Sequence, residues 1–120
     1  MVTLKKKTGQ LAEQKAYLFL RAQGLELIAK NYSCARGEID LIMRDGQDIV
    51  FVEVRSRKQA DYGDAIESVT VSKQKKILHT SMHFLQQRNW LNKVNWRFDV
   101  IGICHDDLEW IKDAFTADIL

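Results

Sequence analysis

Two short segments of this 120-residue chain carry acidic side chains inside otherwise apolar runs. Residues 37–42 contain Glu38 and Asp40, and residues 50–57 contain Glu53, which is followed by Arg55. Each segment reads as a strand, and an unpaired carboxylate buried in a strand is costly. Two acid-bearing strands joined by a tight turn are one way in which a small protein builds a divalent-cation site from oxygen ligands. The pattern therefore indicates cation binding between Asp40 and Glu53.

The turn between the two segments decides whether their carboxylates meet. Residues 44–48 read Arg-Asp-Gly-Gln-Asp, which is a strong hairpin signal. A two-residue turn that includes Gly46 places Asp40 and Glu53 on one face, directly opposite or diagonal to each other. A one-residue bulge would separate them. We expect the other face of the hairpin to be core, formed by Val50, Val52, Val54, Ile39 and Leu41.

A second interpretation of the same pattern involves no cation. Acidic and basic residues that face each other across a hairpin can form a solvated outer surface. Glu38 or Glu53 would then simply pair with an arginine, and such surface pairs contribute little to stability. Spacing alone leaves both interpretations open.

The elements that must position these residues follow from the apolar periodicity along the chain. We expect helices at 8–23 and 72–87, strands at 25–32, 96–103 and 108–115, a hairpin at 37–57 and a loop at 58–64. Thr8 is predicted to cap the first helix and Gly24 to end it. The order α-β-β-β-α-β-β predicts an α/β fold: a mixed five-stranded sheet between two helical layers, with residues 52–54 in a central strand.

Length and composition are typical of one globular domain, with a basic tail at residues 1–7. No apolar run is long enough to cross a membrane, and no signal-peptide core follows the N-terminal lysines, so we expect a cytoplasmic protein. Cys34 and Cys104 lie far apart and form no metal-ligand pattern. The first hundred residues are basic and the last twenty acidic, which is compatible with a polyanionic partner.

The chain resembles the YraN-like family of bacterial proteins along almost its whole length. The resemblance is carried by motifs in both expected helices and in the strands, namely Gly9, Glu13, Ala16, Asn31, residues 37–42 and 51–57, Lys73, Lys76 and residues 97–100. That family is in turn similar to the PD-(D/E)xK nuclease superfamily, in particular to archaeal Holliday-junction resolvases. The resemblance implies a restriction-endonuclease-like core over residues 1–120.

Carried over residue by residue, the resemblance implies a catalytic set of Glu13, Asp40, Glu53 and Arg55. Asp40, Glu53 and Glu13 would bind Mg²⁺ or Mn²⁺, which lowers the pKa of a bound water. Arg55 falls where the superfamily usually has lysine. Arginine keeps its proton and cannot serve as a base, but its planar fork suits a phosphate group. The implied activity is hydrolysis of phosphodiesters in branched or otherwise irregular DNA by a homodimer.

Several basic side chains outside this set are candidate DNA contacts: Lys5, Lys6, Lys7, Arg36, Arg57, Lys58, Lys73 and Lys76. Lysines on a helix are more commonly a solvated face. His79 and His83 have the spacing of a two-histidine metal site but lack a third ligand, so we expect ordinary histidines.

Two alternatives to a nuclease stay open. One is a catalytically inactive nucleic-acid-binding protein of the same fold, in which Arg55 binds phosphate and the acids are structural. The other is an interaction scaffold that binds no nucleic acid. Phosphate-dominated binding weakens steeply as salt rises, which separates these two classes.

Overall fold

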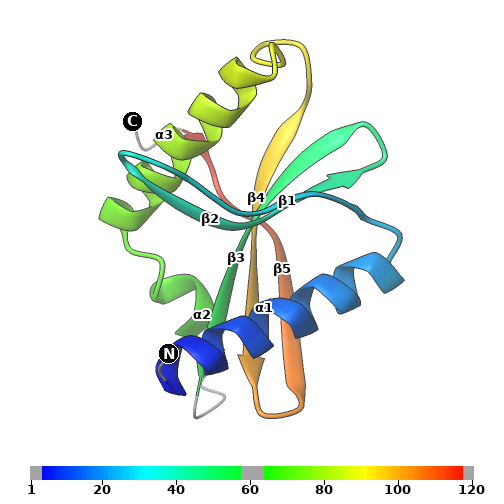
Figure 1. Ribbon diagram of the computed structural model, residues 1–120, viewed down its shortest axis with the longest axis vertical. Coiled ribbons are helices and arrows are strands. Elements are labelled where there is room, and N and C mark those ends of the chain that lie inside the picture. Colours follow the sequence, from blue (N-terminus) through cyan, green and yellow to red (C-terminus); the bar gives the residue numbers. More distant parts are fainter. Residues whose placement is uncertain (1–3, 58–63, 118–120) are drawn as a thin grey trace.

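The computed structural model describes residues 4–57 and 64–117, with side chains from Gly9 to Arg57 and from Ala65 to Ala117. Its elements are α1 (Leu4–Ala22), β1 (Glu26–Cys34), β2 (Gly37–Asp45), β3 (Asp48–Arg57), α2 (Asp64–Glu67), α3 (Val71–Gln87), β4 (Trp96–Cys104) and β5 (Asp107–Phe115), shown in Figure 1. The strands form one sheet in the order β1-β2-β3-β4-β5. The pair β3–β4 is parallel and the other pairs are antiparallel, which confirms the mixed sheet with β3 at its centre.

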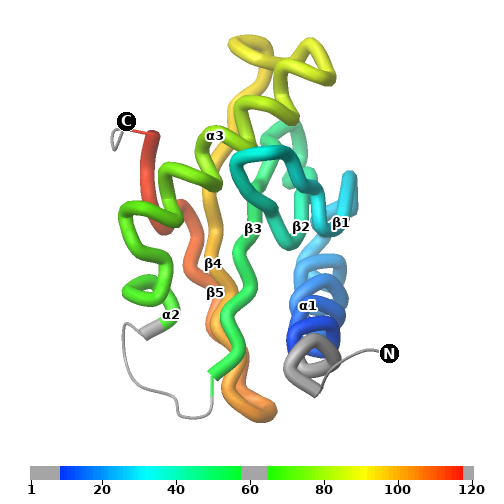
Figure 2. Tube along the Cα trace, turned by 60° about the vertical axis from the view of Figure 1, so that its left-hand side comes forward, coloured from blue at the N-terminus to red at the C-terminus, as the bar shows by residue number. Residues whose placement is uncertain are grey.

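The helices cover opposite faces of the sheet, so the predicted three-layer α/β architecture is confirmed. Figure 2 shows α1 and α3 on the two sides of β3 and β4. The core under α1 contains Ala12, Ala16, Leu20, Leu41, Val50, Val52, Ile101 and Ile103. The core under α3 contains Ile39, Ile42, Phe51, Ile77, Leu78, Phe84, Leu85 and Phe98. Alternate residues of β3 enter the two cores because side chains alternate along a strand.

The first helix begins earlier than predicted and ends where predicted. α1 starts at Leu4, so Thr8 is not its N-cap, and Lys5–Lys7 lie within the helix rather than in a preceding tail. Lysine is a good helix former, and nothing between Leu4 and Thr8 interrupts the helix. At the other end Gly24 has a φ of +97°. The N–H groups of Leu25 and Gly24 donate to the carbonyls of Leu20 and Arg21, which is the Schellman arrangement.

The second long helix begins one residue before its predicted start, behind a threonine cap. The Thr70 hydroxyl accepts a hydrogen bond of 3.3 Å from Lys73 N. The one-turn helix α2 was not predicted, because four residues are too few for a periodic pattern. The loop predicted at 58–64 lies outside the described residues except for its last residue, which begins α2. None of the described helices is long and apolar enough to cross a membrane.

The hairpin has the predicted two-residue turn at Gly46 and Gln47, with Asp45 opposite Asp48 and Gly46 at a φ of +62°. Pairing of β2 with β3 then runs to Leu41 opposite Val52. One prediction about its faces is wrong, because Ile39 lies in the core under α3 and not with Leu41 under α1. The alternation of faces is interrupted between these two residues, where β2 leaves β3.

Candidate active site

Asp40 and Glu53 are the first residues beyond the last β2–β3 pair, Leu41 with Val52. The backbone N–H of Val54 donates a hydrogen bond of 2.8 Å to Asp40 Oδ2. The Val54 N–H group lies past the end of the β2–β3 pairing, so the carboxylate of Asp40 replaces the backbone acceptor that β2 no longer provides. The predicted pair of acids meets at this divergence of the strands. Glu53 is only 7% exposed, so it is not part of a solvated outer face.

Both carboxylates are held in surroundings that disfavour their charged forms. The pKa of Glu53 is raised to about 8, first by burial and then by the negative charge of Asp40. The pKa of Asp40 is also raised, first by burial, while the hydrogen bond from Val54 and the charge of Arg55 oppose the increase. Two neighbouring carboxylates that resist ionisation are the electrostatic condition that a bound cation relieves.

Arg55 pairs with one oxygen of Glu53 and leaves the other without a partner. Arg55 Nη2 lies 3.3 Å from Glu53 Oε2. Glu53 Oε1 and Arg55 Nε are both buried and have no hydrogen-bond partner among the residues that the structure describes. A buried acceptor without a donor is unfavourable, so Glu53 Oε1 is available to a ligand that brings positive charge.

The buried acid Asp99, in the same sheet, has hydrogen-bond donors for both of its carboxylate oxygens. Its side chain is 0% exposed, yet it accepts hydrogen bonds from Arg97 Nε (3.0 Å), Trp110 Nε1 (2.9 Å) and the N–H of Asp113 (3.0 Å). Arg97, two residues earlier on the same strand, forms an ion pair with Asp99. Asp99 has no acceptor capacity to spare for a ligand, whereas Glu53 does.

Glu13 approaches the pair from α1. Its pKa is raised to about 7, first by burial and then by the charges of Asp40 and Glu38, with Lys30 opposing. With its amide nitrogen toward the acids, Asn31 donates to Glu13 Oε1 (2.6 Å) and Glu38 Oε1 (3.1 Å). Asn31 was not predicted to take part in the site. The sequence signal that could have identified this residue is an asparagine within a strand. Asn31 has a φ of +50°, a left-handed backbone conformation that asparagine tolerates better than most residues.

The carboxylates fit a small hard cation as a two-ligand site. Mg²⁺ commonly takes one or two protein carboxylates and keeps several waters, so Asp40 and Glu53 are sufficient. Among the described residues, no three side chains of histidine, cysteine, aspartate or glutamate come together as a complete metal cage. Glu13 is accordingly better described as an outer acid, held by Asn31, than as a third ligand.

A model of the uncharacterised protein family UPF0102 matches residues 12–103. The chain belongs to this family. The UPF0102 protein of Saccharophagus degradans is 49% identical over 111 residues, covering 92% of this chain and 94% of its own. Those of Nitrosococcus oceani (43% over 114 residues, 92% of each chain) and Coxiella burnetii (41% over 119 residues, 98% and 99%) are also similar. The matched segment contains Glu13, Asp40, Glu53 and Arg55.

The basic residues predicted to bind DNA are only partly placed in this UPF0102 protein. Lys58 lies outside the described residues, and Lys5–Lys7 are described only as part of α1. Arg36 directly precedes Gly37, the first residue of β2. Lys76 of α3 lies close to the same point, because a Cβ on Gly37 would be 3.4 Å from Lys76 Cβ. Lys73 Nζ lies 3.5 Å from the Ser68 carbonyl near the start of α3, and Arg57 is the last residue of β3.

The paired histidines of α3 face a different environment from the acids. His83 Nδ1 shares a hydrogen bond with the Tyr32 hydroxyl. His79 and His83 line a pocket of about 360 Å³ that also contains Cys34 and Arg36. The described part of this UPF0102 chain offers these histidines no complete metal site.

Proposed function

We propose that this protein is a divalent-metal-dependent nuclease of the Holliday-junction-resolvase type that hydrolyses phosphodiesters in branched or otherwise irregular DNA. The observation that carries the proposal is Glu53: a buried carboxylate beside Asp40, with one oxygen unpartnered among the described residues. A buried carboxylate with one unpartnered oxygen is costly to the fold, which makes it a candidate for a functional role. Such a role in DNA metabolism implies a cytoplasmic protein.

Asp40 and Glu53 would hold Mg²⁺ or Mn²⁺, which supplies the positive charge that activates a water and offsets charge on the phosphate. Asp40 is kept in place by its bond to Val54 N, so one of its oxygens is already oriented. Glu13, with a pKa of about 7, is suited to take the proton that the attacking water releases. The P–O bond to the leaving oxygen then breaks, and that oxygen takes a proton from solvent.

Arg55 has a phosphate-binding role in this scheme. Its contact with Glu53 Oε2 favours the charged form of that acid, against the burial that opposes it. With a cation held by Asp40 and Glu53, the Arg55 fork would be free to bind a phosphate oxygen. Arg55 does not act as a base, because a guanidinium keeps its proton.

A second candidate function rests on the same arginine. Arg55 lies 3.3 Å from Glu53 and cannot act as a base, which is also compatible with a protein that binds nucleic acid without cleaving it. In that case the affinity for DNA would fall steeply as the salt concentration rises and would not depend on Mn²⁺.

A gel assay with a four-way junction, a duplex and a single strand separates the candidates. Each substrate is incubated with Mn²⁺, Mg²⁺ or EDTA, using wild type, Asp40→Asn, Glu53→Gln and the control Glu109→Gln. Glu109 is an exposed acid of β5 and tests for general charge effects. Metal-dependent cleavage that is lost only in the two site variants supports the nuclease. Salt-sensitive mobility shifts without cleavage support the binding protein. If no substrate is shifted or cleaved, both candidate functions are rejected.

A further inference from the structure

Two arginines from distant parts of the chain stand over one tryptophan. The guanidinium carbons of Arg44, on β2, and Arg88, after α3, each lie 5.5 Å from the centre of the Trp90 ring. Arg88 also lies 5.0 Å from the ring of Phe84. Both arginines are exposed, and neither forms an ion pair with a residue that the structure describes. Glu26 faces Arg44 in the strand register but does not pair with it.

Two guanidinium groups near one indole concentrate positive charge where an anion can bind. The aromatic ring attracts each cation. The aromatic contacts also restrict both side chains, so less conformational entropy is lost when a ligand binds. The pair is therefore preorganised for a group that carries negative charge and accepts planar hydrogen bonds.

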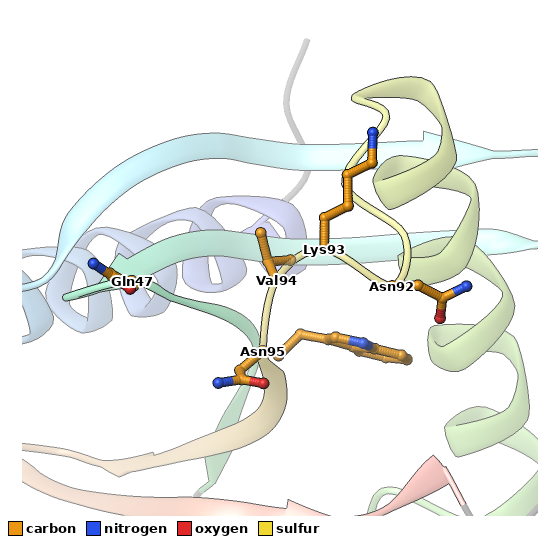
Figure 3. A pocket seen from close by; sticks show the side chains of 6 residues that line it. Gln47, Asn92, Lys93, Val94 and Asn95 are labelled. Carbon is orange, nitrogen blue, oxygen red and sulfur yellow. The ribbon is translucent and has the colours of Figure 1, made fainter.

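A polar pocket of about 500 Å³ lies beside the arginine pair, at the same end of the molecule. It is lined by Gln47 from the β2–β3 turn and by Asn92, Lys93, Val94, Asn95 and Trp96 from the α3–β4 connection. Figure 3 shows the amides of Gln47 and Asn95 on one side of this connection and Asn92 on the other. Side-chain amides both donate and accept hydrogen bonds, so they can pair with the edge of an unpaired nucleobase. The Trp96 ring packs edge-on against Phe51 and Phe98 and belongs to the core.

We infer that the end of the molecule formed by the β2–β3 turn and the α3–β4 connection is a second nucleic-acid contact surface, where Arg44 and Arg88 bind backbone phosphates and the neighbouring amide pocket takes an unpaired base. This inference rests on the proposed function and specifies its substrate as DNA with a displaced or single-stranded segment. Arg44 is four residues from Asp40 along β2, which is about 13 Å of extended chain. A few nucleotides of one DNA strand span that distance.

Nucleic acid fits this surface better than an acidic protein does. Arginine forks match phosphate oxygens bidentately, and side-chain amides pair with the edges of bases. An acidic peptide would also bond to these groups, but it carries no planar base edge for the amides to pair with. The observations on this surface therefore favour a polynucleotide.

The test is binding of fluorescein-labelled junction, single strand and duplex in EDTA, measured by fluorescence anisotropy over a series of salt concentrations. The variants are Arg44→Gln/Arg88→Gln and its charge-preserving counterpart Arg44→Lys/Arg88→Lys. Lys112→Gln is the matched control, because Lys112 Nζ lies 4.3 Å from the centre of the Trp110 ring, in a similar contact on β5. Thermal melts of every variant report whether the fold is retained.

We expect the double glutamine variant to bind all three DNAs roughly tenfold more weakly. Its slope of log K against log salt should fall by about 2, one for each lost phosphate contact. Lys112→Gln should bind as wild type, and the lysine variant should recover the slope. Gln47→Ala/Asn95→Ala should lose affinity for the single strand and junction but not for the duplex.

The outcomes separate this inference from the proposed function. Suppose that the wild-type protein binds or cleaves DNA, and that the folded Arg44→Gln/Arg88→Gln variant has the same salt slope as wild type. This result overturns the inference and leaves the proposed nuclease function intact. An equal loss for duplex and single strand in Gln47→Ala/Asn95→Ala overturns the base pocket. Wild-type protein that neither binds nor cleaves DNA overturns the proposed function, and the inference falls with it.

Discussion

The backbone N–H of Val54 donates to the carboxylate of Asp40 across the point where β2 and β3 stop pairing. Asp40 therefore has a structural role that is separate from its charge. It satisfies a half-buried donor at a break in the sheet, and it places a second carboxylate beside Glu53. Substitutions can separate the two roles.

Asp40→Asn should keep the structural role and lose the chemical one. Its amide oxygen can still accept from Val54, so the thermal midpoint should stay near that of wild type, whereas Asp40→Ala should cost about 1–2 kcal/mol. Both variants should lose Mn²⁺ binding measured by calorimetry, because one of two carboxylate ligands is gone. Tight Mn²⁺ binding by Asp40→Asn would contradict the assignment of Asp40 as a ligand.

Glu53→Gln should stabilise the metal-free protein at alkaline pH. The folded-state pKa of Glu53, about 8, is above its ordinary value of 4.5, so the folded protein retains a proton that the unfolded chain releases. The contribution of Glu53 to stability is full below about pH 4.5 and is lost as pH rises through 8.

Thermal melts in EDTA check this prediction. At pH 9 the Glu53→Gln variant should melt at least about 4 °C above wild type, which corresponds to about 1 kcal/mol. At pH 4 the difference should vanish, and Glu109→Gln should show none at either pH. A glutamine variant that melts lower than wild type at pH 9 would show that Glu53 is stabilising as a carboxylate.

Arg55→Lys should preserve or raise metal-dependent cleavage, because lysine retains the positive charge and can lose its proton when desolvated. Arg55→Gln should abolish cleavage, since it removes the phosphate contact and the partner of Glu53. Single-turnover rates with a labelled junction distinguish the two variants. A folded Arg55→Lys protein without activity would show that the guanidinium fork itself is required.

Gly102→Ala should displace α2 from β4. A Cβ on Gly102 would lie 2.8 Å from Ala65 Cβ, closer than two carbon atoms can approach. We expect a loss of about 1–3 kcal/mol in denaturant unfolding. Adding Ala65→Gly should recover part of this loss, and a non-additive double-mutant cycle would identify the contact as the cause. Equal losses with and without Ala65→Gly would place the strain elsewhere.

Much of the fold follows from local signals in the chain. The helix stop at Gly24, the two-residue turn at Gly46 and the central strand through Val52 each depend on residues close together in sequence. The start of α1 was missed because a capping residue such as Thr8 also fits inside a helix, and only hydrogen bonding decides between the two. The turn length also determined the pairing register, and with it the meeting of Asp40 and Glu53.

The sequence by itself determined the order of the elements, the register of the hairpin and which acids lie nearest each other along it. Only the tertiary structure decided that Ile39 turns to the opposite core from Leu41, that Asn31 bridges Glu13 and Glu38, and that Arg44 and Arg88 share one tryptophan. The reason is the range of the interactions. Turn length and side-chain alternation act over a few residues, whereas burial and charge depend on segments that meet only after the chain has folded.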